Sequence, residues 1–268
     1  MATASTTSTL ERFQKVLQAS KHIVALCGAG LSAESGVPTF RGKGGLWRTF
    51  DATSLATPRS FAANPSRVWE FYHYRRELVL KTEPNKAHKA LKDFEDKILS
   101  QSKEKNQTFI VLTQNVDGLS SGTKNLVEIH GSLFRTRCIE CGDIQNNRDS
   151  PIAPALKGTE TSNLDANIPI EKLPQCLKCK KGLLRPDVIW FEENLNEDIV
   201  KIIEFELKRC DLLLVIGTSG IVYPAAGYVT RVSSRGGKVA QFNIEKVGKA
   251  DFEFIGPCGE TLPTALGV

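Results

Sequence analysis

A short apolar run that ends in glycines constrains the fold of this chain more than any other feature. Residues 22–27 read HIVALC and lead directly into Gly28-Ala29-Gly30. A run that is apolar at successive positions and stops at a tight turn is typical of a parallel strand buried on both faces. Four later runs have the same character, namely Phe109–Thr113, Asp187–Phe191, Asp211–Ile216 and Lys238–Asn243. We therefore expect an α/β fold with a Rossmann-like, doubly wound parallel sheet.

One helix between these strands is marked at both ends. Asn196–Cys210 opens with an asparagine, has two acidic residues in its first turn and ends with Lys208 and Arg209. These charges match the helix dipole, which is positive at the N-terminus and negative at the C-terminus.

Two stretches interrupt the alternation of strands and helices. Residues 47–105 are helix-like and charged, and residues 134–184 contain four cysteines around a loop rich in proline, glycine and threonine. The 268 residues suffice for one large domain with a sizeable insertion. We interpret the two stretches as the helical part and the metal-binding part of a smaller lobe, and we assign residues 1–46, 106–133 and 185–268 to the sheet domain.

The seven cysteines include two Cys-x-x-Cys pairs. An odd number argues against a fully paired disulfide framework and favours a reducing compartment. Two such pairs in a loop-rich segment predict one structural Zn²⁺ bound by Cys138, Cys141, Cys176 and Cys179. A redox-active pair is the alternative. The other three, Cys27, Cys210 and Cys258, are expected to be small buried side chains.

The glycines after the first strand match a phosphate-binding fingerprint. Residues 28–33 read GAGLSA, which fits the pattern G-x-G-x-x-G/A of dinucleotide-binding turns. A second strand about 20 positions later, with the acidic residue typical of dehydrogenases, is missing. We expect a dinucleotide site without standard hydride transfer, and a tight turn with no ligand is the alternative.

Polar side chains follow three other predicted strands, at 114–117, 217–219 and 243–245. Ligands of parallel sheets bind beyond the carboxyl ends of the strands, so the joint placement of these residues supports a nucleotide site. His130, which follows a short apolar run and precedes a glycine, is a candidate catalytic base. A histidine without a catalytic role is the alternative.

The composition argues against several other classes of protein. No apolar run approaches the roughly 18–20 residues that cross a bilayer. The formal charge of +5 comes from 35 basic and 30 acidic residues, and it is too small and too scattered to demand a nucleic-acid partner. We expect neither a membrane nor a nucleic acid as partner, and the slight positive charge favours acidic ligands.

Together, these motifs resemble those of a known family. The residues that carry the resemblance are Gly28-Ala29-Gly30-x-Ser32-x-x-Ser35-Gly36-x-Pro38-x-Phe40-Arg41, Thr113-Gln114-Asn115-x-Asp117, Ile129-His130-Gly131, the cysteine pairs and Gly217-Thr218-Ser219. From about Lys21 to Pro263 the chain is similar to sirtuins, the NAD-dependent protein lysine deacylases. The stretch from Trp69 to Glu77 further resembles class III sirtuins, which remove succinyl, malonyl and glutaryl groups.

The resemblance implies NAD as the cofactor. It places ADP-ribose along residues 28–47, with Arg41 near the phosphates and Phe40 over the reacting ribose carbon, and it places Asn115 and Asp117 at the nicotinamide carboxamide. The implied cofactor residues are Gly28, Ala29, Gly30, Ser32, Glu34, Pro38, Thr39, Phe40, Arg41, Trp47, Gln114, Asn115, Val116, Asp117, His130, Gly217, Thr218, Ser219, Asn243, Ile244, Glu245 and Cys258.

The resemblance also implies the reaction and the substrate contacts. The acyl-lysine carbonyl oxygen displaces nicotinamide to give an alkylimidate, with His130 as general base and Asn115 as a second catalytic residue, and O-acyl-ADP-ribose is released. Tyr72 and Arg75 bind the carboxylate of the acyl group, and Ala56 leaves room for its length. The peptide docks between Phe191–Leu195 and Gly220–Tyr223, with Phe191, Val222 and Tyr223 as contact residues.

Two positions depart from the family pattern. The loop after Asp117 is two residues shorter and lacks a histidine. Glu192 replaces the glycine of a Phe-Gly-Glu motif, which puts a negative charge beside the implied peptide groove and costs about 1 kcal/mol if the backbone there needs a positive φ.

Two other functions are consistent with the same residues. One is mono-ADP-ribosyl transfer, which uses the same cleavage of NAD, and the other is a catalytically weak NAD-binding or zinc interaction module. We expect acyl-lysine proteins or peptides as partners, a monomeric state, and a mitochondrial and/or cytoplasmic location.

Overall fold

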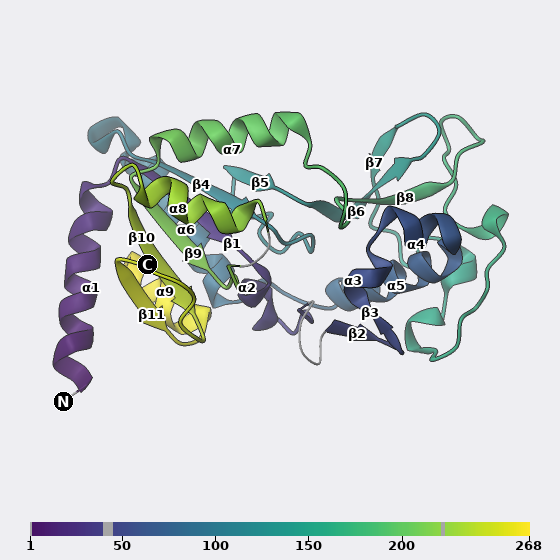
Figure 1. Ribbon diagram of the computed structural model, residues 1–268, viewed down its shortest axis with the longest axis horizontal. Coiled ribbons are helices and arrows are strands. Elements are labelled where there is room, and N and C mark those ends of the chain that lie inside the picture. Colours follow the sequence, from purple (N-terminus) through teal and green to yellow (C-terminus); the bar gives the residue numbers. More distant parts are fainter. Residues whose placement is uncertain (1, 40–44, 221–222) are drawn as a thin grey trace.

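The computed structural model describes residues 2–39, 45–220 and 223–268, and it contains the parallel sheet that the sequence predicts (Figure 1). Six strands lie side by side, and each neighbouring pair is parallel. Their order is β11 (Phe252–Ile255), β10 (Lys238–Asn243), β9 (Leu212–Ile216), β1 (His22–Cys27), β4 (Thr108–Thr113) and β5 (Leu126–Glu128). In register, Ile23 of β1 lies between Phe109 of β4 and Leu212 of β9.

Helices cover both faces of this sheet. One face carries α1 (Ala2–Ala19), α6 (Lys86–Lys105) and α9 (Cys258–Leu266), and the other carries α7 (Glu197–Arg209) and α8 (Tyr228–Ser233). Side chains alternate along β1. Ala25 and Cys27 therefore belong to the core beneath α1, α6 and α9, while Val24 and Leu26 belong to the core beneath α7 and α8. Within the described part of the chain, no helix is both long and apolar enough to cross a membrane.

The helix predicted at Asn196–Cys210 is confirmed as α7. The Asn196 side chain accepts hydrogen bonds from the backbone N–H groups of Asp198 and Ile199. It thereby pairs two of the N–H groups that every helix leaves unsatisfied at its N-terminus.

The prediction of a parallel strand at Asp187–Phe191 is wrong. Residues Leu184–Val188 form β8, which pairs antiparallel with β6 (Gly131–Cys138) in a second sheet that also contains β7 (Ile144–Asn146). An apolar run indicates burial but not the core in which a strand is buried, and Val188 packs in a different core from β1.

The second sheet belongs to a smaller lobe, on the right in Figure 1. Its core is built around the large side chains of Trp69, Phe71 and Trp190. The lobe also contains β2 (Leu46–Trp47), β3 (Phe50–Asp51), α3 (Ala52–Leu55), α4 (Pro58–Ala63), α5 (Pro65–Val79) and the 3₁₀ turns η2 (Pro154–Leu156), η3 (Thr159–Thr161) and η4 (Ile170–Lys172). Two short elements remain in the large lobe, α2 (Ala29–Ala33) after β1 and η5 (Ala225–Gly227) before α8.

The predicted domain limits differ from this arrangement in two places. α6, which lies within the predicted helical part at residues 47–105, packs on the large sheet through Ala87, Leu91 and Phe94. β8, most of which lies within the predicted sheet segment at residues 185–268, belongs to the second sheet. An amphipathic pattern shows that one side of an element is buried, but not which partner covers it.

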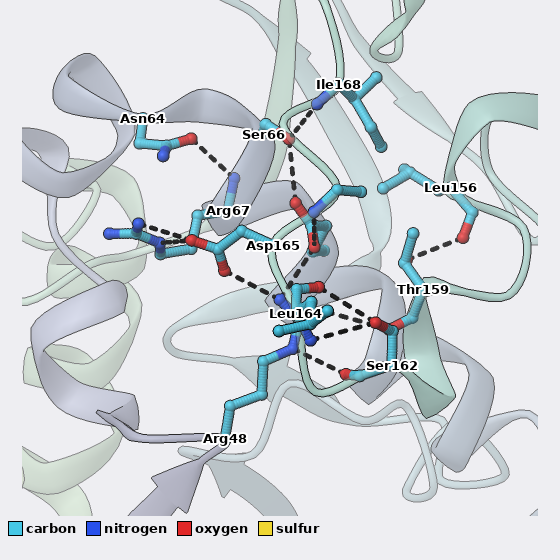
Figure 2. A network of polar contacts seen from close by, with 12 residues as sticks. Arg48, Asn64, Ser66, Arg67, Leu156, Thr159, Ser162, Leu164, Asp165 and Ile168 are labelled. Carbon is cyan, nitrogen blue, oxygen red and sulfur yellow. Dashed lines mark hydrogen bonds and ion pairs between the residues drawn. The ribbon is translucent and has the colours of Figure 1, made fainter.

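A network of buried polar contacts holds the smaller lobe together (Figure 2). The Arg48 guanidinium donates to Glu70 at 2.9 Å and to Asp165 at 3.0 Å, and it also donates to two backbone carbonyl oxygens of the loop that contains Asp165. Glu70 in turn accepts from Ser66, whose hydroxyl accepts from the N–H of Ile168. The Arg48 and Glu70 side chains are 4% and 0% exposed, so neither charge has water as a substitute partner.

We predict that Arg48→Ala lowers the free energy of unfolding by about 3–5 kcal/mol, because it leaves the Glu70 carboxylate buried and unpaired. Arg209→Ala is the control, since its pair with Glu206 is partly exposed and is expected to contribute no more than about 1 kcal/mol. Urea unfolding of both variants measures the difference, and equal losses would contradict the role of the Arg48 network.

Candidate active site and zinc centre

A cleft of about 840 Å³ opens at the carboxyl ends of the central parallel strands. Residues that follow β1, β4, β9 and β10 form one side, and the residue after α3, residues of α5, and the end of β8 with the segment after it form the other. The order of the strands reverses at β1, because the chain continues to β4 on one side of it and later to β9 on the other. Ligands of open parallel sheets bind at such a switch point.

The cleft brings together most of the residues that the sequence analysis selected. The lining residues among those implied for the cofactor are Gly28, Ala29, Gly30, Ser32, Pro38, Thr39, Gln114, Asn115, Val116, Asp117, His130, Gly217, Thr218, Ser219, Asn243, Ile244 and Glu245. The lining residues among those implied for the substrate are Ala56, Tyr72, Arg75, Phe191 and Tyr223.

Three residues implied for the cofactor do not line the cleft. The Glu34 carboxylate accepts hydrogen bonds from the N–H of Gly259 at 3.0 and 3.2 Å, so it connects α2 to the start of α9. Trp47 is buried in the core of the smaller lobe, and Cys258 is buried beneath β10. Phe40, Arg41 and Val222 lie outside the described residues.

The glycines after β1 are required by a close approach between two stretches of backbone. The N–H of Gly30 donates to the carbonyl oxygen of Gly217 at 2.7 Å. A Cβ atom on Gly28 or on Gly30 would lie 2.8 Å from that same oxygen, which is too close for a side chain. The glycines of the fingerprint therefore allow the turn after β1 to pack against the turn after β9. This role is separate from any contact of these glycines with a ligand.

Polar groups at this edge are available to a ligand. The buried Nε2 of Gln114 has no hydrogen-bond partner among the residues that the structure describes. The amide nitrogen of Asn115 donates to the Gly28 carbonyl at 3.0 Å and to Ser32 Oγ at 3.1 Å, so the amide oxygen is the atom that it offers to the cleft. Donors and acceptors placed in this way fit the amide and hydroxyl groups of NAD.

A buried histidine contacts the hydroxyl of Ser32. His88 Nδ1 accepts from the N–H of Asn85 at 3.3 Å, and its Nε2 lies 3.5 Å from Ser32 Oγ. Burial lowers the pKa of His88 to about 4, so the ring is neutral at physiological pH. With Nδ1 as acceptor, the single ring proton is on Nε2 and faces Ser32, which fixes the orientation of Asn115 through the serine.

His130 has the environment of a general base. Its Nδ1 lies 3.0 Å from the carbonyl oxygen of Gln114, and because a carbonyl only accepts, this contact places the ring proton on Nδ1. Nε2 then carries the lone pair. Burial lowers the pKa of His130, with the hydrogen bond to Gln114 acting in the opposite direction, so the neutral base predominates near neutral pH.

Tyr72 and Arg75 reach the cleft from one face of α5. The Tyr72 hydroxyl accepts from Trp190 Nε1 at 2.9 Å, and burial raises its pKa, so the hydroxyl stays protonated and has its own hydrogen to donate. Burial lowers the pKa of Arg75, opposed by Tyr72 and Asp117, but a guanidinium remains charged in proteins. Ala56, also buried at the cleft, adds little volume beside them.

Sequence reasoning missed several apolar lining residues. They are Val37, Val188, Ile189, Trp190, Val200 and Pro224. The signal for three of them was present, because residues 188–190 are apolar and extend from the end of a strand to Phe191 and two glutamates. The misassignment of that strand to the large sheet concealed it.

Both departures from the family pattern have visible structural consequences. The shorter loop after Asp117 is anchored on α6, since the N–H groups of Lys124 and Asn125 donate to the two oxygens of the fully buried Glu95 carboxylate at 2.6 Å. Glu192 has a φ of +74°, so the condition under which a side chain at this position is costly is met. A non-glycine residue in this region costs about 1 kcal/mol or more.

Four cysteine sulfurs converge in the smaller lobe. All lie within 4.8 Å of one another, with Cys138 and Cys179 3.7 Å apart and Cys141 and Cys176 3.8 Å apart. Sulfurs bound tetrahedrally to Zn²⁺ at about 2.3 Å lie about 3.8 Å from each other. The backbone N–H groups of Glu140 and Cys141 also donate to Cys138 Sγ at 3.4 Å. The residues fit a structural zinc ion, and four thiolates leave no position open for catalysis.

The fold occurs in proteins of known structure. A solved structure described as a complex of a Sir2 homologue with NAD is 36% identical to this chain, with a TM-score of 0.79, and the match covers 96% of this chain and 92% of that one. Residues 28–224 match the Sir2 family. The chain therefore belongs to the Sir2 family.

Individual members of the family are similar along almost the whole chain. "NAD-dependent protein deacylase sirtuin-5, mitochondrial" of Canis lupus familiaris is 52% identical over 274 residues, which cover 99% of this chain and 87% of the relative. "NAD-dependent protein deacylase" of Daphnia pulex is 48% identical over 268 residues, which cover 97% and 96%. A solved Sir2 mutant with a p53 peptide and NAD is 27% identical, with a TM-score of 0.76 over 96% of this chain and 97% of that one.

We predict that Cys141→Ser abolishes stoichiometric zinc binding and destabilises the smaller lobe, because binding of the metal contributes to the folding free energy of the segment that the cysteines join. Metal analysis by mass spectrometry, with thermal unfolding, measures both effects. Cys210→Ser, at a cysteine outside the cluster, is the control and should retain one zinc per chain. Full zinc content in Cys141→Ser would contradict the assignment.

Proposed function

We propose that this protein is an NAD-dependent protein-lysine deacylase that removes succinyl, malonyl and glutaryl groups. The observation that carries the acyl preference is the placement of Tyr72 and Arg75, a buried hydroxyl and a buried guanidinium, in the same cleft as His130. Relatives of about 50% identity named NAD-dependent protein deacylase support the reaction, and a neighbouring structure that holds a peptide and NAD supports a polypeptide substrate.

The polar edge of the large sheet would hold NAD. The turn at residues 28–30 and the turn at residues 217–219 offer backbone groups, and the side chains of Gln114, Asn115 and Asp117 suit a carboxamide. When bound, NAD would supply the ribose that takes up the acyl group on a hydroxyl oxygen, while the bond to nicotinamide breaks, one water is consumed, and nicotinamide, free lysine and O-acyl-ADP-ribose are released.

His130 would accept a proton at Nε2 during this transfer. Its other ring nitrogen is held by the Gln114 carbonyl, so the ring orientation and the tautomer are both fixed before the substrate binds. Asn115 is fixed in the same way by Ser32 and the Gly28 carbonyl. Side chains positioned beforehand reduce the reorganisation that the reaction requires.

The far end of the acyl group would meet α5. A guanidinium binds a carboxylate through two parallel hydrogen bonds, and the protonated Tyr72 hydroxyl can add a third. The Arg75 guanidinium is only 7% exposed, so little water would screen its attraction for a carboxylate at the end of the acyl group, and an acetyl group has no charge to take part in this attraction.

The relatives with the name sirtuin-5 are also named mitochondrial, which supports a mitochondrial location for this protein. A cytoplasmic location, a monomeric state and the absence of a nucleic-acid partner stay predictions.

We predict that Arg75→Met lowers kcat/KM for succinyl-lysine peptides by about 10²-fold or more, the effect of removing one partner of a buried charge pair, with a much smaller loss on acetyl-lysine peptides. Arg59→Met, at an exposed arginine of α4 outside the cleft lining, is the control and should change both rates little. Equal losses on both peptides would contradict the acyl preference.

The products of the same assay test the reaction itself. O-acyl-ADP-ribose formed together with free lysine supports deacylation, while ADP-ribosylated protein would support a mono-ADP-ribosyltransferase. NAD binding without nicotinamide release that depends on acyl-peptide would instead support an interaction module.

We predict that kcat/KM declines on the acid side with a midpoint below the ordinary histidine pKa of about 6.5. Burial depresses the pKa of His130, so the active neutral base persists to lower pH and is lost as the pH falls through that depressed value. A pH profile with a succinyl-lysine peptide measures this, and an acid limb with its midpoint well above 6.5 would contradict the assignment.

A further inference from the structure

The segment that forms one wall of the cleft makes a strained turn at its most exposed point. The N–H of Glu193 donates to the carbonyl oxygen of Trp190 at 3.1 Å, and between them Glu192 has a φ of +74°. This is the geometry of a type II turn, in which the third residue needs a positive φ and is commonly glycine. The chain keeps a glutamate at a position where glycine would relieve backbone strain. Strain of this kind is often retained where it serves a function.

The two glutamates of this turn have different surroundings. Glu193 is paired, because its carboxylate accepts two hydrogen bonds from Arg185 at 2.6 and 2.8 Å and a third from the N–H of Trp190. The Glu192 side chain is exposed and has no hydrogen bond or ion pair with any residue that the structure describes. The charge of Glu192 is therefore available to a molecule that enters the cleft.

The mouth of the cleft carries exposed acidic groups, and its interior carries a buried cation together with a buried carboxylate. Glu192 and Glu245 are exposed lining residues, whereas Arg75 and Asp117 are buried lining residues. Exposed apolar side chains accompany the acidic groups at the mouth, with Phe191 45%, Tyr223 79% and Ile244 74% exposed. This surface suits a polypeptide segment with basic and apolar side chains.

We propose that Glu192 is a specificity-determining residue that selects acyl-lysine sites flanked by lysine or arginine. The proposal rests on the proposed deacylase function and specifies its substrates. A basic flanking residue pairs with Glu192 at the mouth while the acidic acyl group passes inward to Arg75. An acidic flanking residue is repelled at the mouth, so the two charges together select a basic segment that carries one acidic modification.

The test uses the full chain and three succinyl-lysine peptides that differ only in the residues next to the modified lysine, which are arginine, alanine or glutamate. We expect the wild-type kcat/KM to be about 3–10-fold higher for the arginine peptide than for the alanine peptide, and lowest for the glutamate peptide. Raising the salt from about 0.01 M to about 1 M should remove most of this preference, because the Debye length falls from about 30 Å to about 3 Å.

Three variants separate charge from backbone strain. Glu192→Gln and Glu192→Gly should both lose the preference for the arginine peptide, and Glu192→Lys should reverse it. Glu192→Gly should in addition raise the melting temperature by about 2 °C, since glycine relieves the positive φ. Glu197→Gln, which removes an exposed acid that does not line the cleft, is the matched control and should keep the wild-type ratio.

An unchanged arginine-to-glutamate peptide ratio in Glu192→Gln would overturn the proposal, even if every peptide is deacylated. Failure of the proposed function looks different, because no peptide would then be turned over by any variant. In that case the binding of the same labelled peptides, measured by fluorescence anisotropy, still decides whether Glu192 selects basic segments.

Discussion

The cleft depends on one close contact between two turns. The hydrogen bond between Gly30 and Gly217 draws the ends of β1 and β9 together, and neither Gly28 nor Gly30 can carry a side chain there. Asn243 adds to the same edge, because its amide nitrogen donates to the carbonyl of Thr218 at 2.9 Å. The polar residues after four strands thus form one surface, although they come from distant parts of the chain.

The two sides of the cleft have different chemical characters, and each follows from the element that supplies it. The sheet side presents backbone groups, amides and a histidine kept neutral by burial. The α5 side presents a permanent cation and a hydroxyl that does not ionise at physiological pH. A substrate with an uncharged reacting carbonyl and a charged end would match both sides at once.

Local sequence patterns predicted those elements whose structure depends on residues close together in the sequence. The apolar run at residues 22–27, the capped helix after Asn196 and the spacing of the four cysteines each correspond to an observed feature. The patterns could not assign β8 or α6 to the correct lobe, because burial alone does not identify the partner. The contact of Arg48 with Ser162, 114 residues away, has no local signal.

The candidate site was predictable to different degrees on its two sides. Polar residues after parallel strands follow a general rule, so residues 114–117 and 217–219 could be found without any relative. Tyr72 and Arg75 lie within a charged helix, and only the family resemblance distinguished them from surface residues. Glu34 could not be separated from the lining residues, because its partner Gly259 is 225 positions away.

The cysteine cluster is connected through hydrogen-bonded strands to α5, which forms part of the cleft. The cysteines fasten β6 and the chain leading into β8, and these strands hold α5 through hydrogen bonds from Trp69 to the Leu184 carbonyl at 2.8 Å and from Arg76 to the Leu133 carbonyl at 2.6 Å. The six-stranded sheet has its own core. The two lobes are therefore expected to open as separate units, and zinc supply would govern the lobe that contributes Tyr72 and Arg75 to the cleft. Metal scarcity would then open the cleft on its α5 side while the six-stranded sheet stays folded.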